Sequence, residues 1–121
     1  MQEKLYGPEL ADDAFVVDLI DAATVDVDAS AGNNSTTWRL AIGGNRTLGN
    51  PTRARDSQRF LFEIISDGSA RTLAFDTKYQ GSDDLALASI VTSGTKTYYL
   101  LVVYNLAADK FRQLSINKGF A

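Results

Sequence analysis

Short apolar segments separated by turn residues run through most of this chain, and no other feature limits its fold so strongly. The clearest segment places Phe60, Phe62 and Ile64 at every second position, with Leu61 and Ile65 at the alternate ones. Side chains two residues apart share one face of a strand, so this segment is predicted to be a central strand. Its second apolar face is expected to be partly covered, either by the chain's own arm or by another subunit.

Turn residues divide the rest of the chain in the same way. Asp67-Gly68-Ser69 directly follows the predicted central strand, and an Asp-Gly pair between apolar runs predicts a hairpin. The predicted strands cover residues 14–20, 24–28, 37–42, 46–48, 59–66, 70–75, 85–92, 98–104 and 110–116. Short strands about ten residues apart, without a long amphipathic helix, are typical of a sandwich. We therefore predict an all-β fold: an antiparallel β-sandwich, jelly-roll-like, with about eight short strands.

The length of 121 residues fits one domain with a core of its own. Residues 1–13 are polar and acidic, contain Gly7-Pro8 and show no periodicity, so they are predicted to form an extended N-terminal arm. Residues 14–121 are then the β-sandwich domain.

Composition excludes several classes of chemistry. The chain contains no cysteine and no histidine, which removes disulfides, thiolate metal sites and the usual general base. Asp26, Asp28 and Ser30 begin like a calcium loop, but Ala31 and Thr37 stand where such a loop needs glycine and glutamate. We expect no enzymatic activity, no cofactor and no metal site.

Charge and hydropathy bear on partners and location. The net charge is -3, and the basic residues form no continuous run, so no nucleic-acid binding is expected. No apolar run approaches the ~20 residues that span a bilayer, and the N-terminal residues lack the layout of a signal peptide. The protein is expected to have no membrane partner and to be made in a cytoplasm.

The amino-acid sequence of residues 44–75 resembles that of a known module. It joins Gly44-Asn45-Arg46-Thr47-Leu48-Gly49-Asn50-Pro51, Ser57-Gln58-Arg59-Phe60, Asp67-Gly68 and Arg71-Thr72-Leu73-Ala74-Phe75. Similar sequence motifs occur in a small β-sandwich module of bacteriophage virion proteins, which is found in head decoration proteins and in tail or fibre components. The resemblance extends over about residues 24–120.

This resemblance implies a bacteriophage capsid decoration, or cement, protein. Such a protein would bind the outer head surface as a homotrimer, stabilise contacts between major capsid protein subunits, and enter the virion in the bacterial host cytoplasm. The short chain, the absence of a stem sequence and the arm favour decoration. The arm is expected to bind the capsid through four residues: Leu5, Tyr6, Leu10 and Phe15.

The subunit interface is expected on the second apolar face of the central strand and on the loop before it. Arginine can donate forked hydrogen bonds to carboxylates, and the acid-rich N-terminal region of a neighbouring copy supplies these. The expected interface residues are Arg53, Arg55, Arg59, Leu61 and Ile65.

The alternative hypothesis is a tail, baseplate or fibre-tip structural protein that binds a glycan. Aromatic rings offer sugars an apolar face, and the candidates for such a platform are Trp38, Tyr79, Tyr98, Tyr99 and Tyr104. The same residues also suit a core, because Trp38 shares its predicted strand face with Leu40 and Ile42.

Overall fold

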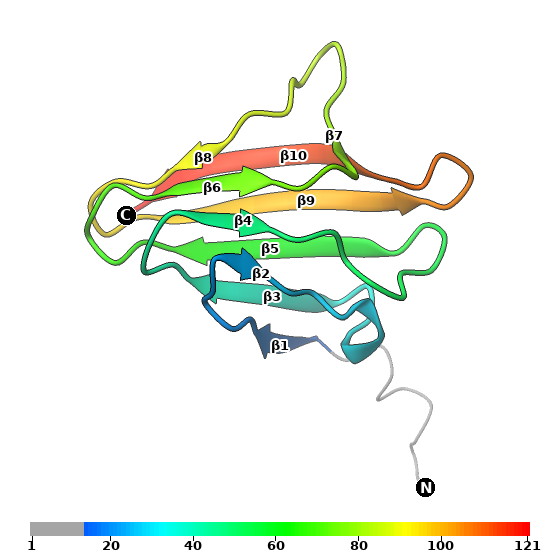
Figure 1. Cartoon of the computed structure of the whole chain (residues 1–121), viewed down its shortest axis with the longest axis horizontal. Coiled ribbons are helices and arrows are strands. Elements are labelled where there is room, and N and C mark those ends of the chain that lie inside the picture. Colours follow the sequence, from blue (N-terminus) through cyan, green and yellow to red (C-terminus); the bar gives the residue numbers. More distant parts are fainter. Residues whose placement is uncertain (1–13) are drawn as a thin grey trace, which may run out of the picture.

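The computed structural model describes residues 14–121, which form ten strands in two sheets and one short 3-10 turn, η2 (Ala29–Ala31) (Figure 1). The six-stranded sheet has the order β1 (Phe15–Asp18), β3 (Thr36–Ala41), β5 (Arg59–Ile65), β9 (Thr97–Asn105), β10 (Lys110–Phe120) and β7 (Tyr79–Gln80). The four-stranded sheet has the order β2 (Thr24–Val25), β4 (Arg46–Leu48), β6 (Thr72–Phe75) and β8 (Ile90–Val91). The all-β prediction is confirmed.

The first six strands wind around one core by alternating between the two sheets. β1, β3 and β5 are parallel neighbours in the larger sheet, and β2, β4 and β6 are parallel neighbours in the smaller one. Phe15 pairs with Thr36, and Thr37 pairs with Leu61, so one turn of the winding takes 21 to 24 residues in the larger sheet. We call residues 15–75 the winding region.

Three polar links tie successive turns of the winding together, each between residues 25 positions apart. Arg46 donates to Asp21, and Arg53 donates to Asp28. The backbone N–H of Arg59 donates to the side chain of Asn34 at 2.9 Å. In each link, the side chain of an aspartate or asparagine in one turn accepts a hydrogen bond from an arginine residue in the next turn.

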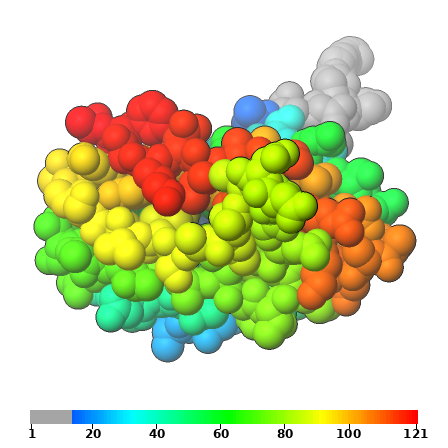
Figure 2. All heavy atoms as spheres, turned by 90° about the horizontal axis from the view of Figure 1, so that it is seen from above, coloured from blue at the N-terminus to red at the C-terminus, as the bar shows by residue number. Residues whose placement is uncertain are grey.

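The last two strands are arranged differently. β9 and β10 form an antiparallel pair across a short turn at residues 106–109, and β9 also lies antiparallel to β5. We call residues 97–120 the hairpin region. Figure 2 shows the neighbouring segment 81–89 beside β10, where the amide of Gln113 donates to the carbonyls of Leu85 and Ala86.

The core lies between the two sheets and is rich in aromatic rings. The predicted alternation of β5 is confirmed, because Phe60, Phe62 and Ile64 are buried. Phe60 contacts Trp38 on one side and Phe111 on the other, with ring centroids 5.6 Å apart in both pairs. One core therefore holds the winding region and the hairpin region together.

The structure corrects the predicted topology. Five of the eight strand pairings are parallel, so the prediction of an antiparallel sandwich was wrong. The jelly-roll arrangement and the number of eight strands are not confirmed. Alternation of side chains is the same in parallel and antiparallel strands, so the sequence pattern does not distinguish them.

The turn at Asp67-Gly68 is not a hairpin. It leads from β5 in the larger sheet to β6 in the smaller one, and Gly68 forms an isolated bridge with Gly94. Gly68 adopts a φ of 96°, which a residue with a Cβ rarely adopts, so the glycine serves the corner between sheets. The predicted strand 85–92 is correspondingly shorter, with only Ile90–Val91 paired.

Candidate functional site

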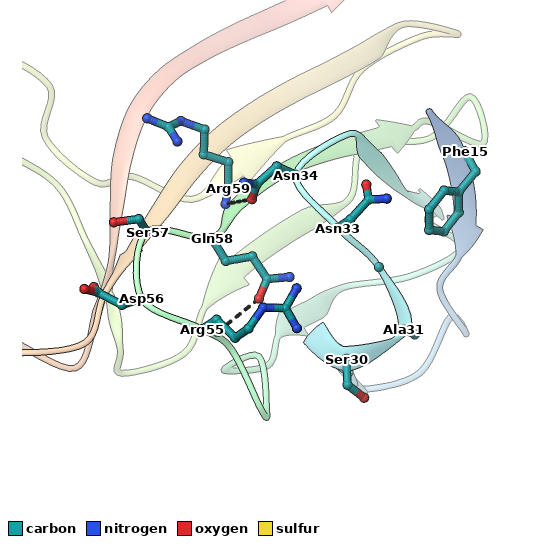
Figure 3. Close-up of a pocket in the computed structure, with 11 residues that line it drawn as sticks. Phe15, Ser30, Ala31, Asn33, Asn34, Arg55, Asp56, Ser57, Gln58 and Arg59 are labelled. Carbon is teal, nitrogen blue, oxygen red and sulfur yellow. Dashed lines mark hydrogen bonds between the residues drawn. The ribbon is translucent and has the colours of Figure 1, made fainter. Parts of the chain in front are cut away.

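A surface hollow of about 630 Å³ lies at one end of the winding region (Figure 3). Three segments surround it: the start of β1, the segment 30–34 after η2 begins, and the loop 55–59 that enters β5. The polar lining residues are Ser30, Asn33, Asn34, Arg55, Asp56, Ser57, Gln58 and Arg59. Phe15 and Ala31 contribute the larger apolar side chains of the lining.

Gln58 joins the loop 55–59 to η2. Its side chain is only 3% exposed. The amide nitrogen donates to the carbonyl of Ala29 at 3.1 Å, and the amide oxygen accepts from the backbone N–H of Arg55 at 3.1 Å. Because both ends of this buried amide are satisfied, Gln58 fixes the loop against η2 and is not available to a ligand.

Arg53 does not face a neighbouring copy with a free guanidinium. It makes a forked pair with the carboxylate of Asp28, which also accepts hydrogen bonds from Ser30 and so caps η2. The hydrogen bonds from Arg53 and Ser30 lower the pKa of Asp28 to about 2. Asp28, which the calcium-loop pattern had singled out, therefore has an arginine as its partner.

The loop that carries the arginines is conformationally unusual. Arg53 and Ser57 adopt φ angles of 59° and 65°, in the left-handed region where side chains other than glycine are uncommon. Such backbone is often found at binding sites, because neighbouring contacts must hold it in place. Here Arg53 is held by Asp28, and the backbone N–H of Ser57 donates to the carbonyl of Tyr104 at 2.8 Å.

Arg55 and Arg59 remain free within the part of the chain that the structure describes, residues 14–121. Neither guanidinium forms an ion pair or a hydrogen bond there. Figure 3 shows the Arg55 side chain beside Gln58 and the segment 30–34, with Arg59 extending on the far side of Asn34. The hollow thus presents two separated positive charges to solvent, together with the single negative charge of Asp56.

The predicted interface residues on β5 lie on the outer face of the six-stranded sheet. Leu61 pairs with Thr37 on one side and with Leu101 on the other, and Thr37 also pairs with Val16. These residues form a row across four strands, and Val16 is 42% exposed. Ile65 and Arg59 lie on the same face at the two ends of β5.

A charged row runs next to this apolar row. Arg39 donates to Glu63, and the hydroxyl of Tyr99 donates to the other oxygen of Glu63 at 2.6 Å. Burial raises the pKa of Glu63, but the hydrogen bonds from Tyr99 and Arg39 outweigh it, so the pKa lies below its usual value. The centre of the outer face is therefore a satisfied ionic cluster rather than a free charge.

The predicted aromatic platform for a glycan is not present. Trp38 is 0% exposed, and the side chains of Tyr79, Tyr98 and Tyr104 are buried in the core. Tyr99 is half-buried and bound to Glu63. The accessible aromatic ring of the hollow is instead Phe15, at 40% exposure.

The predicted arm residues are divided by the structure. Leu5, Tyr6 and Leu10 lie outside the described residues, whereas Phe15 is the first residue of β1 and lines the hollow. The sequence prediction did not include Asn34 and Gln58. Asn34 and Arg59 lie 25 residues apart, as do the partners in the other two links between turns. This common spacing is a sequence signal from which such pairs can be predicted.

Among residues 14–121, no group of three or more His, Cys, Asp or Glu side chains is placed to hold a metal ion. Within the same residues, no helix has the length and apolar character to cross a membrane. A comparison with protein-family models and with curated proteins finds no match to this chain.

Proposed function

We propose that this chain is a bacteriophage capsid decoration protein, which binds the outer head surface and stabilises contacts between major capsid protein subunits. Its mechanism is binding alone, with a homotrimer offering several contacts at once so that weak individual contacts add up. The resemblance of residues 44–75 to virion modules motivates the assignment.

The observation that carries the proposal is the outer face of the six-stranded sheet. Leu61 and Leu101 lie side by side there, and Val16 extends the row to the sheet edge. Residues 14–121 form two sheets, and the smaller one packs against the inner face, so within these residues the outer face carries apolar side chains that favour a protein partner. The ionic cluster of Glu63 lies beside this row. It offers a partner polar contacts that fix how the two surfaces align, in addition to the apolar contact of the row.

Capsid occupancy tests the proposal directly. Heads that lack the protein are mixed with the full chain or with a variant that lacks residues 1–13, and occupancy is measured by cryo-microscopy. We expect the full chain to occupy regular positions on the head, and the shortened variant to fold but to leave them empty. Binding to tails or fibres, with bare heads, would contradict decoration and favour the alternative.

The sheet face is tested by two matched substitutions. Leu61→Glu places a charge on the outer face of the larger sheet, and Val91→Glu places one at an exposed apolar position of the smaller sheet. Light scattering is expected to give a trimer for Val91→Glu and a monomer for Leu61→Glu. Equal masses for the two variants would exclude this face from the interface.

A further inference from the structure

The hollow described above has an imbalance in its hydrogen-bonding groups that the decoration proposal does not use. The guanidinium groups of Arg55 and Arg59 are donors only, and neither has a partner among residues 14–121. The side-chain oxygen of Asn34 accepts from the backbone N–H of Arg59, so the amide nitrogen of Asn34 is a further donor of the lining. Asp56 is the one carboxylate of the lining, and it accepts a hydrogen bond from the backbone N–H of Leu106. The two guanidinium groups outnumber it, so a ligand with acceptors and negative charge complements the hollow.

The apolar part of the lining limits the ligand further. Phe15 offers one partly exposed ring, and Ala31 adds only a methyl group. A peptide anchor such as leucine or tryptophan requires an enclosed apolar pocket, which this lining does not provide. A sugar ring requires one flat apolar contact and several hydrogen bonds, and the lining provides both.

The rigidity of the hollow favours binding without rearrangement. The buried amide of Gln58 fixes the loop to η2, and the pair between Arg53 and Asp28 fixes the neighbouring residues. Gly32 allows this close packing, because a Cβ there would lie 2.6 Å from the ring of Trp38. A pre-formed site loses less conformational entropy when it binds a ligand.

We infer that this hollow binds an acidic saccharide. Arg55 holds a sugar carboxylate through its forked donors, Phe15 contacts the apolar face of a sugar ring, and Arg59 contacts a second acidic sugar along the chain. The inference goes beyond the decoration role and does not depend on it, because Leu61 and Leu101 of the apolar row do not line the hollow.

Binding is tested with the full chain labelled with nitrogen-15 and two pairs of probes. The acidic probes are tetragalacturonate and sialyllactose, and the neutral controls are a neutral galactose oligomer and lactose. We expect the acidic probes to shift the backbone signals of residues 30–34 and 55–59, and the neutral probes to leave them unchanged. The absence of saturable shifts with either acidic probe at millimolar concentration would overturn the inference.

Three variants of two exposed arginines, Arg55 and Arg112, separate the specific site from general charge attraction. Arg55→Ala is expected to weaken binding about tenfold or more, because a charge-assisted hydrogen bond is lost. Arg55→Lys keeps the charge but loses the fork, so it should recover only part of the affinity. Arg112→Ala removes an exposed arginine on β10, outside the hollow, and should leave binding unchanged. Equal losses for Arg55→Ala and Arg112→Ala would overturn the inference.

A peptide ligand is the competing explanation, and it has its own probe. A synthetic peptide of residues 1–13 carries Glu3, Glu9, Asp12 and Asp13 and is added to the same labelled protein. If the acidic saccharides bind and the peptide does not, the inference is supported. If the peptide shifts the signals of the hollow and the saccharides do not, the site is a protein-binding site and the inference is wrong.

Discussion

The winding region and the hairpin region build one core by different routes. In the winding region, strands that lie side by side are separated by 21 to 27 residues, and the chain visits the other sheet between them. In the hairpin region, β9 reaches its neighbour β10 through one short turn. Contacts between residues distant in sequence require more loop closure, so they form later and more slowly than local ones. The two regions therefore differ in how they are assembled, although both supply the same core.

Truncation of one buried leucine in each region gives the largest expected effect. Leu48 in β4 and Leu100 in β9 are almost fully buried. Leu48→Ala and Leu100→Ala should each lower the free energy of unfolding by about 2–5 kcal/mol. Stopped-flow kinetics should show that Leu100→Ala mainly slows folding and that Leu48→Ala mainly speeds unfolding. The reverse assignment would show that the winding forms first.

A close contact inside the winding gives the next effect. A Cβ on Gly49 would lie 2.8 Å from the backbone carbonyl of Val25 in the adjacent turn. Gly49→Ala should therefore lower the free energy of unfolding by about 1–3 kcal/mol, measured by urea denaturation. Ala107→Gly, in the exposed turn of the hairpin region, is the counterpart and should change it by about 1 kcal/mol or less. Similar losses at both sites would show that the turns of the winding are not closely packed.

The seam between the two regions gives a smaller effect that depends on pH. Tyr99 in β9 donates to Glu63 in β5, and this bond lowers the pKa of Glu63. A lowered carboxyl pKa contributes stability above the unfolded pKa, and that contribution is lost as pH falls. Tyr99→Phe should thus lower the free energy of unfolding by about 0.5–1.5 kcal/mol at pH 7 and by less at pH 3. An equal loss at both pH values would exclude the ionised form of Glu63 as the acceptor.

The smallest expected effect tests one link between turns of the winding. In the folded protein the pKa of Asp28 is about 2, against an ordinary value of 3.8. The stability that Asp28 contributes is complete above pH 3.8 and is lost as pH falls towards 2. Arg53→Ala should raise the pKa of Asp28 and reduce this acid-dependent loss, as followed by carboxyl NMR titration. Arg55→Ala is the control, because its side chain does not contact Asp28, and an equal rise there would contradict the assigned pair.

Local patterns predicted the individual strands well and their arrangement poorly. The alternation of Phe60, Phe62 and Ile64 predicted β5 and its buried face, because alternation depends only on the strand itself. The direction of the neighbouring strands was not accessible in this way. The two Arg-Thr-Leu triplets at 46–48 and 71–73 were a weak signal of strand direction. They coincide with β4 and with the start of β6, which are adjacent parallel strands of the smaller sheet. A repeat of only three residues was too short to indicate a winding.

The candidate site was predicted in part, for the same physical reason. Arg55 and Arg59 were expected to bind partners because free arginines favour carboxylates, and the structure places both on one hollow. Arg53 lies 25 residues after Asp28, and the winding places the carboxylate of Asp28 within reach of the Arg53 guanidinium. Which arginine is free therefore depends on the length of one turn, and local sequence does not reveal that length.

Because β1 to β6 alternate between the two sheets, the length of such a chain can change by whole turns of the winding. Each complete turn adds one strand to each sheet and preserves which side chains face inward. A protein built in this way tolerates the gain or loss of a whole turn far better than the gain or loss of a few residues, which would shift the register of every later strand. Variants of different length are therefore expected to differ by steps of about one turn, with the hairpin region retained as a constant end piece.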